Sequence, residues 1–396
     1  MIQHTGAAFC RPLRVLLVAD SLDVGGAEQH VVSLAVALAQ KGYHVTLACS
    51  VEGSLASFPR QGNVLVQPLL HTLVKRQFSL GFAWQLSQLV RRGSFDLVHA
   101  HMYTSAFASA CALFGTSIPL VITEHSQANW RSKHAQRCSR WFYHRASHII
   151  AVSKEIRRRL IERDNVPFDR VSVIMNATPL LAVPNTEPVL PVEIGKGLLV
   201  GMVARLQPEK GPTYFLEAAA YVLRVVQDIQ FLVVGDGPMR AKLQAYAVQL
   251  GIQKHVHFLG FRLDARSLIG LLDILVVPSL SEGTPLVTLE AMTADVAVVA
   301  TKVGGIPEQI RHQQEGLLVP PGNSSALGEA ILHLLRHPLQ RMQLGVAGRR
   351  RAQSQFLFST MVQETEAIYH TLLDRQEQRD LDRQEHDSLF AETGGL

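Results

Sequence analysis

The chain has 396 residues, of which 47% are hydrophobic and 18% are charged. That composition excludes a disordered or fibrous protein, and the length favours two domains over one. Residues 1–190 hold 19 lysines and arginines against 11 acidic residues, whereas residues 191–396 hold 19 against 22. A basic half followed by an acidic half indicates two domains with different partners.

The cysteines are far apart and form no CxxC pair, which argues against a disulfide framework or a thiolate metal site. They are Cys10, Cys49, Cys111 and Cys138. The apolar run at residues 15–19 is too short for a secretory signal peptide and soon meets Asp20. Together these features predict a cytoplasmic protein.

In the first half, short runs rich in valine, leucine and isoleucine are each followed by a helical pattern. Predicted strands occupy residues 14–19, 43–49, 97–100, 120–123, 148–152 and 171–175. A glycine turn and a periodic helix at 27–40 follow the first strand. The longest uncharged stretch, residues 102–123, contains Ser, Thr, Gly and Pro, so it predicts a small-residue helix and a buried strand rather than a membrane span.

Residues 179–191 contain four prolines and read as a linker, after which the strand–helix pattern restarts. Predicted strands occupy residues 198–203, 230–234, 255–259, 274–277, 296–300 and 316–319. The alternation predicts an α/β protein with two Rossmann-like, doubly wound parallel sheets. The predicted division is a domain at 1–180, a linker at 181–192, a domain at 193–360, and a C-terminal helix with a charged tail at 361–396. The C-terminal helix is expected to pack back on the first domain.

Ligands of such sheets bind where loops leave the carboxyl ends of the strands, so two facing sheets would form a cleft. The loop and helix SLSEGTPLVTLEAM, residues 279–292, follow one such strand and carry Glu282 and Glu290. Glu282 could bind the hydroxyls of a sugar, and Glu290 those of a ribose. A helix-capping acid and an exposed acid are the alternative interpretation.

The helix in this segment is expected to begin near Leu286, with Pro285 suited to the first helical position. The N–H groups of Leu286 and Val287 would then point outward at the positive end of the helix. Such an end is an anion site that suits a phosphate group.

Two cations follow another predicted strand, in the segment VARLQPEKG at residues 203–211. Arg205 and Lys210 could neutralise a diphosphate without a metal, at about 1.5–3 kcal/mol for each charge-assisted hydrogen bond. Two solvated surface charges are the alternative. The glycine turn VVGDGPMR at 233–240 lacks the third glycine of GxGxxG, which disfavours a nicotinamide site.

The sequence resembles the retaining glycosyltransferases of family 4, also called glycosyltransferase group 1, which have the two-domain GT-B fold. The resemblance extends over nearly the whole chain and depends on the order of many short motifs. These are VGGAEQHV, DLVHAHM, ITEHS, AVSKEI, ARLQPEKG, VGDGP, HFLGF, PSLSEG, LEAM, VGGIPE and GLLVPPG. Glu282 and Glu290 match the E-x7-E element of the family.

The resemblance implies a donor site for a nucleotide diphosphate sugar, with a UDP-sugar favoured, and no cofactor or metal ion. Arg205 and Lys210 would bind the diphosphate, and Glu290 would hold the ribose. Gly25 and Gly26 would let the backbone of the first domain approach the phosphates.

The resemblance also implies a catalytic pair, in which Glu282 holds the transferred sugar and His125 lies near the sugar and the acceptor. The reaction would retain the anomeric configuration, and the leaving phosphate would help to take the acceptor proton. The acceptor would be a glycan or a lipid-linked molecule in cell-surface polysaccharide or glycolipid synthesis.

The chain departs from the family pattern at two places. It has Asn176-Ala177-Thr178-Pro179 where the family usually has Asn-Gly-x-Asp, and it has Asp295 and Ala297 where a glycine and a proline are usual. Asp295 can still form a turn, because aspartate tolerates the left-handed conformation better than most residues.

His99 and His101 alternate on a predicted strand and therefore point to one face. A metal pair is one interpretation, but with 17 histidines in the chain we favour roles in the core or in the cleft wall.

The basic segment at 131–160 mixes cations with aromatic residues: Trp130, just before it, and Trp141, Phe142 and Tyr143. One interpretation is a surface that docks on anionic lipid at the inner face of the membrane and receives a lipid-linked acceptor. The other is a pair of helices with a solvated basic face.

Two other functions stay open, a sugar-nucleotide epimerase of the same layout and a non-catalytic sugar-nucleotide-binding subunit. A glycosidase is disfavoured because it needs no phosphate site. Nucleic-acid binding is disfavoured because no recognised module accompanies the basic charge.

Overall fold

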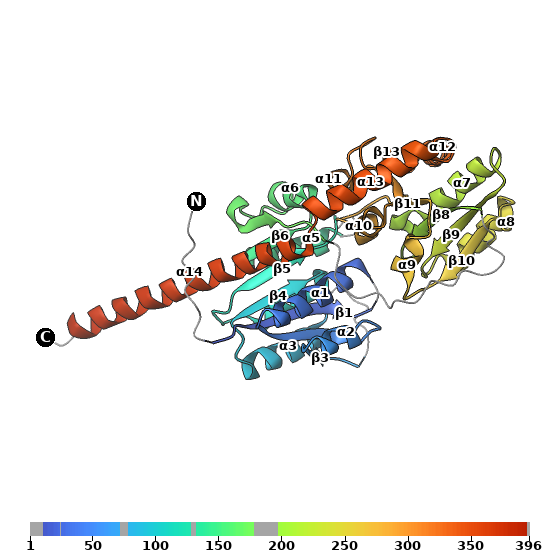
Figure 1. Ribbon diagram of the computed structural model, residues 1–396. Helices are drawn as coiled ribbons and strands as arrows, with labels where there is room; N and C mark the ends of the chain where they lie inside the picture. The colour runs from blue at the N-terminus through green and yellow to red at the C-terminus, as the bar shows by residue number, and fades with distance from the viewer. Residues whose placement is uncertain (1–10, 24, 72–77, 128–131, 178–196, 394–396) are drawn as a thin grey trace.

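The computed structural model in Figure 1 describes residues 11–23, 25–71, 78–127, 132–177 and 197–393. The chain forms two domains, each built on a parallel sheet, and a long C-terminal helix that lies along the first domain and projects beyond it. The predicted linker at 181–192 lies outside the described residues.

The first domain has a seven-stranded parallel sheet in the order β3-β2-β1-β4-β5-β6-β7. Its strands are β1 Arg14–Ser21, β2 His44–Val51, β3 Leu65–Pro68, β4 Leu97–His101, β5 Leu120–Glu124, β6 His148–Ala151 and β7 Val171–Val173. Its helices are α1 Gly26–Gln40, α2 Ser57–Gln61, α3 Leu80–Arg92, α4 Tyr103–Ala112, α5 Lys133–Arg145 and α6 Lys154–Glu162.

The second domain has a six-stranded parallel sheet in the order β10-β9-β8-β11-β12-β13. Its strands are β8 Leu198–Val203, β9 Ile229–Val234, β10 Val256–Gly260, β11 Ile274–Val277, β12 Ala297–Thr301 and β13 Leu317–Val319. The helices that follow are α7 Pro212–Leu223, α8 Arg240–Gln249, α9 Ala265–Ile269, α10 Leu286–Thr293, α11 Ile306–Gln309, α12 Ser324–Arg336, α13 Pro338–Gln355 and α14 Phe358–Thr393.

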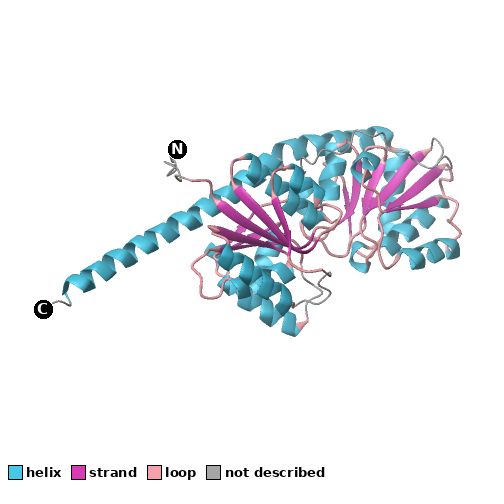
Figure 2. Ribbon diagram, turned by 90° about the horizontal axis from the view of Figure 1, so that it is seen from below, coloured by secondary structure: helices cyan, strands magenta, loops and turns pink. Residues whose placement is uncertain are grey.

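Each sheet is covered by helices on both faces, as Figure 2 shows, which is why its strands are mostly apolar. In β1, alternate residues enter opposite cores: Leu16 and Val18 pack in one cluster, and Leu17 and Ala19 in the other. The second domain is divided in the same way between two clusters.

Every predicted strand is present, and each differs from its predicted bounds by at most two residues. The sequence analysis missed β3 at Leu65–Pro68, because this short edge strand contains Gln67 and ends at a proline. The uncharged stretch at 102–123 forms α4 and β5, as predicted. Among the described residues, no helix combines the length and the apolar character needed to cross a bilayer.

Helix α14 begins on the first domain, where Met361, Val362, Tyr369 and Leu372 join the core cluster around α1 and β1. The Tyr369 hydroxyl lies 2.5 Å from Nδ1 of His99, and Lys41 pairs with Glu366 at 2.6 Å. The first part of α14 therefore binds the C-terminal segment to the first domain.

Candidate active site

Glu282 lies in the loop between β11 and α10, and its side chain is only 8% exposed. Lys210 Nζ binds both carboxylate oxygens, at 2.7 and 2.8 Å, and the Ser279 hydroxyl donates to Oε1 at 2.7 Å. Lys210 ends the short 3-10 helix Pro208–Lys210 that follows β8, the strand next to β11. The structure thus joins Lys210 and Glu282 directly, whereas the sequence predicted only that they share a site.

Arg205 lies in the same loop after β8 and is exposed to solvent. The neighbouring Leu206 N–H donates to the carbonyl of Asp236 at 2.9 Å, so the glycine turn after β9 supports the loop that carries Arg205. This exposed cation lies close enough to Glu28 of the first domain for the two charges to interact.

Helix α10 begins at Leu286, and Pro285 precedes it as the capping residue with ψ at 130°. The prediction that Pro285 takes the first helical position is therefore wrong by one residue, because its extended ψ lies outside the helical range. Leu286 is buried, Val287 is half-buried, and Glu290 lies one turn further along.

The start of α10 meets the start of α1 from the other domain. Gly25 is the extended capping residue of α1, and the Cβ position of Gly26 lies 3.9 Å from the Leu286 side chain. Two positive helix ends therefore converge beside Arg205 and Lys210, which suits an anion with more than one phosphate.

Two half-buried or buried carboxylates border this region. Burial raises the pKa of Glu290, with Arg266 opposing the shift. Burial likewise raises the pKa of Glu28, and the charge of Arg205 opposes it. The Glu28 carboxylate covers the face of Gly25, a position that the sequence analysis missed although the acid stands two residues after the glycine pair.

His125 follows β5 and belongs to a group of imidazoles with His30, His99 and His101. His101 Nδ1 lies 3.2 Å from His125 Nε2, and the His30 and His125 ring centroids are 4.9 Å apart. Burial lowers the pKa of His125 to about 4 and that of His99 to about 3, so both rings are neutral at pH 7. His125 can therefore donate or accept a hydrogen bond but brings no positive charge.

The two strand histidines share a face, as predicted, but differ in surroundings. Both ring nitrogens of His99 are bound inside the core, by Tyr369 and by Thr123. The His101 ring lies 4.2 Å from that of His99 in a tilted arrangement and stacks on His125 with the centroids 5.5 Å apart. His30, from α1, was missed because a lone histidine in an apolar helix gives no sequence signal.

The two domains touch at the loop that carries Glu282. A Cβ at Gly283 would lie 2.1 Å from the carbonyl oxygen of His125, and the Thr284 hydroxyl donates to the carbonyl of Val152. Asn176 Nδ2 donates to the Thr284 carbonyl at 2.8 Å. The segment that starts at Asn176 departs from the family pattern, but its asparagine is present and joins the two domains through this hydrogen bond.

The comparison with known families covers both domains. Residues 24–180 match the model described as Glycosyltransferase Family 4, and residues 191–351 match the one described as Glycosyl transferases group 1. The chain belongs to the group 1, family 4 glycosyltransferases. This result confirms the family that the motifs predicted.

Curated relatives of this glycosyltransferase act on different substrates. The phosphatidyl-myo-inositol mannosyltransferase of Mycobacterium leprae is 27% identical over 89% of this chain and 95% of the relative. The UDP-Gal:alpha-D-GlcNAc-diphosphoundecaprenol alpha-1,3-galactosyltransferase of Escherichia coli is 26% identical over 63% of this chain and 68% of the relative.

Among solved structures, Anabaena HepE in complex with UDP and glucose has a TM-score of 0.77 at 24% identity. The match covers 91% of this glycosyltransferase and 100% of HepE. With the two parallel sheets described above, this likeness confirms the GT-B fold.

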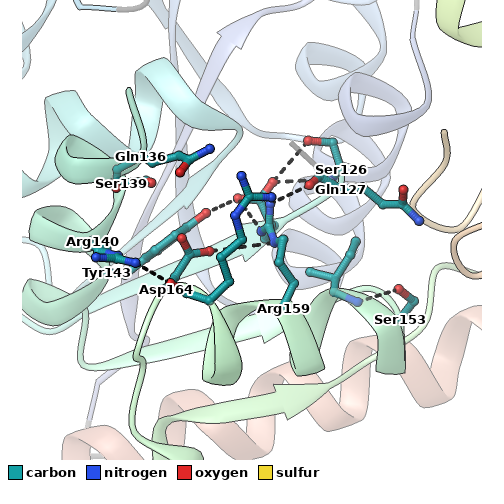
Figure 3. A network of polar contacts seen from close by, with 12 residues as sticks. Ser126, Gln127, Gln136, Ser139, Arg140, Tyr143, Ser153, Arg159 and Asp164 are labelled. Atoms are coloured by element: carbon teal, nitrogen blue, oxygen red, sulfur yellow. Dashed lines mark hydrogen bonds and ion pairs between the residues drawn. The ribbon is translucent and has the colours of Figure 1, made fainter. Parts of the chain in front are cut away.

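A buried polar network supports the loop of the glycosyltransferase that carries His125, as Figure 3 shows. Arg159 on α6 lies 3.5 Å from Glu124 and 3.7 Å from Asp164, and its Nη1 donates to the carbonyl of Gln127 at 2.8 Å. The Tyr143 hydroxyl donates to Glu124, next to His125. The network therefore fixes both ends of the segment that contacts the second domain.

Arg159→Met is expected to lower the free energy of unfolding by about 3–5 kcal/mol, because it leaves two buried carboxylates without their shared cation. Chemical denaturation measures the change. The matched control is Arg158→Met, at an exposed position of the same helix, which should change stability by no more than about 0.5 kcal/mol. Equal stability of the two variants would contradict this role of Arg159.

Asp295 adopts the left-handed conformation, with φ at 59°, as its position in place of the usual glycine predicts. Arg349 pairs with its carboxylate at 2.6 Å. Ala297, the second replacement, is the first residue of β12 and is buried.

The basic segment of the glycosyltransferase forms α5, strand β6 and most of α6, while Trp130 lies outside the described residues. Phe142 and Tyr143 are fully buried and cannot form a surface, because the apolar side of α5 packs into the core. Trp141 is 41% exposed, and the Arg145 guanidinium lies 5.6 Å from its ring and 4.8 Å from that of Phe114. Of the aromatic residues predicted for this surface, the described part of α5 therefore exposes one, Trp141, beside Arg145.

Proposed function

We propose that the protein is a retaining glycosyltransferase that moves a sugar from a nucleotide diphosphate sugar to an acceptor hydroxyl without a metal ion. The observation that carries the proposal is the buried Glu282 carboxylate, bound through both oxygens by Lys210 and four residues before the start of α10. A carboxylate fixed beside a phosphate-binding helix end suits a ligand with hydroxyls at one end and phosphates at the other.

In this mechanism, negative charge grows on the diphosphate as its bond to the sugar breaks. Arg205, Lys210 and the helix ends at Gly26 and Leu286 would stabilise that charge, and Glu290 would hold the ribose. Preorganised groups of this kind commonly supply the largest share of a rate enhancement. Glu282 would orient the sugar, and the leaving phosphate would take the acceptor proton on the same face.

His125 would contribute a neutral imidazole near the sugar and the acceptor. A neutral ring can hydrogen-bond a hydroxyl without adding charge beside the departing diphosphate. The backbone carbonyl of His125 lies against Gly283 of the second domain. This contact supports a role for His125 that requires the two domains to be in contact.

A UDP-sugar is the favoured donor and a lipid-linked molecule in glycan or glycolipid synthesis is the favoured acceptor. Two relatives support this choice: one is named for transfer from UDP-Gal to a diphosphoundecaprenol glycan, and the other for mannosyl transfer to phosphatidyl-myo-inositol. The likeness at 26–27% identity supports the class of substrate and not one sugar.

The test is a thermal-shift screen with UDP- and GDP-sugars, followed by transfer to lipid-linked acceptors and NMR of the anomeric proton in the product. A retained configuration in the presence of a chelator is expected. An inverted linkage would contradict the retaining mechanism, and loss of activity with the chelator would contradict metal independence. Conversion of the donor without any acceptor would instead indicate an epimerase, and donor binding without turnover a non-catalytic subunit.

We further propose that α5 docks on anionic lipid through Trp141 and Arg145. Trp141→Ala is expected to lower co-sedimentation with phosphatidylglycerol vesicles several-fold, whereas Trp84→Ala, at an exposed position of α3, should leave it unchanged. Binding that does not depend on anionic lipid would contradict the docking surface.

A further inference from the structure

Three histidines from separate parts of the first domain converge on one point. His30 comes from α1, His101 ends β4 and His125 follows β5. Each offers a ring nitrogen, and these atoms all lie within 4.8 Å of one another. His101 is fully buried, His30 nearly so, and His125 is half-buried.

Within the group, His101 Nδ1 and His125 Nε2 face each other and share one hydrogen bond at 3.2 Å, which a cation bound between the two rings would replace. His101 Nε2 and His125 Nδ1 are both buried and have no hydrogen-bond partner in the described part of the chain. A buried polar atom left without a partner costs about 1–3 kcal/mol. Burial also keeps these rings neutral, so that each has a lone pair to share.

We propose that His30, His101 and His125 bind one late first-row divalent cation, with Zn²⁺ the best fit. Imidazole suits zinc, copper, cobalt and nickel, whereas magnesium and calcium need oxygen ligands. Three imidazoles leave the fourth tetrahedral position open, as in zinc sites that bind water or substrate. Nitrogens around tetrahedral zinc lie about 3.4 Å apart, so small side-chain rotations close the ring of ligands.

The neighbours of the three histidines stabilise such a site. His99, held on both nitrogens by Tyr369 and Thr123, packs against His101 with the ring centroids 4.2 Å apart and the planes tilted by 31°. On the other side, Asn176 contacts His30 and raises its pKa, against the larger effect of burial. Supports of this kind orient imidazole ligands in metal sites.

The bound cation would oppose transfer rather than assist it. His125 is the residue proposed to lie beside the sugar and the acceptor, and a cation on its ring would remove that hydrogen-bonding group. The site therefore goes beyond the proposed function, because it adds an inhibitory ligand to a reaction that needs no metal.

The experiment is a Co²⁺ titration of the full chain, followed in the visible spectrum and then by displacement with Zn²⁺. One Co²⁺ per chain with the intense bands of a four- or five-coordinate ion is expected. His30→Asn should weaken binding by at least about 100-fold. The control is the double variant His333→Asn/His337→Asn, which removes a stacked surface pair at 4.4 Å and should bind as the wild type does.

Loss of the spectrum in the control but not in His30→Asn would overturn the proposal in favour of the surface pair. X-ray absorption of the zinc-loaded wild type needs no variant and should show three imidazole ligands at about 2.0–2.1 Å. Fewer than three imidazoles, or no binding, would also overturn it. None of these readouts depends on transfer, so a failed sugar assay and a failed metal site are told apart.

Discussion

Glu282→Ala is expected to lower kcat for sugar transfer by about 10²–10³-fold while nucleotide binding persists. The carboxylate is buried and held by Lys210 and Ser279, so it is oriented before any ligand arrives. Removing it takes away the group proposed to hold the transferred sugar. It also frees the Lys210 ammonium, which can then bind the diphosphate with no competing carboxylate.

The Kd for UDP should accordingly stay the same or decrease, while kcat falls. Isothermal calorimetry and initial rates measure the two quantities separately. Glu209→Ala, an exposed acid beside Lys210, is the control and should leave both near the wild-type values. Lost UDP binding together with unchanged turnover would show that the roles of Glu282 and Lys210 are assigned wrongly.

Much of the fold could be predicted because most buried strands are rich in valine, leucine and isoleucine and are followed by a helical pattern. The strand β3 escaped because LVQP is short, polar at Gln67 and closed by a proline. The left-handed turn at Asp295 was predictable, since few side chains other than asparagine and aspartate tolerate it.

The sequence predicted which loops carry the site residues, but not which of these residues contact one another. Arg205, Lys210 and Glu282 follow strands whose carboxyl ends share one edge of a sheet. The direct pairing of Lys210 with Glu282 depends on β8 lying next to β11, a strand order that the sequence does not reveal. His30 and Glu28 escaped for a similar reason, because on α1 alone they look like ordinary helix residues.

The interface between the domains follows from glycines whose partners lie far away in sequence. Gly283 lies against the carbonyl of His125, and a Cβ at Gly304 would lie 3.1 Å from the side-chain nitrogen of Gln127 in the first domain. The SEG motif indicates a loop. Its glycine is needed because the backbone of the other domain leaves no room for a Cβ. Sequence periodicity carries no information about that contact.

Gly283→Ala is therefore expected to lower kcat/KM by about 10²-fold, although Gly283 itself contributes no side chain to the proposed site. The new methyl carbon would lie 2.1 Å from the His125 oxygen and 3.1 Å from Val152, so the domains must separate by roughly 1 Å. Separation moves Glu282 away from His125, and a displacement of that size commonly costs two orders of magnitude in rate. UDP should still bind, because its proposed contacts in the second domain are unchanged.

Gly81→Ala is the matched control, since a Cβ there meets no atom within 4 Å and the residue lies in helix α3. It should keep wild-type rates and a wild-type melting temperature. A Gly283→Ala enzyme with wild-type kcat/KM would mean that catalysis does not require this close approach. The rate loss with UDP binding intact would instead identify closure of the two domains, rather than donor affinity, as the step that Gly283 serves.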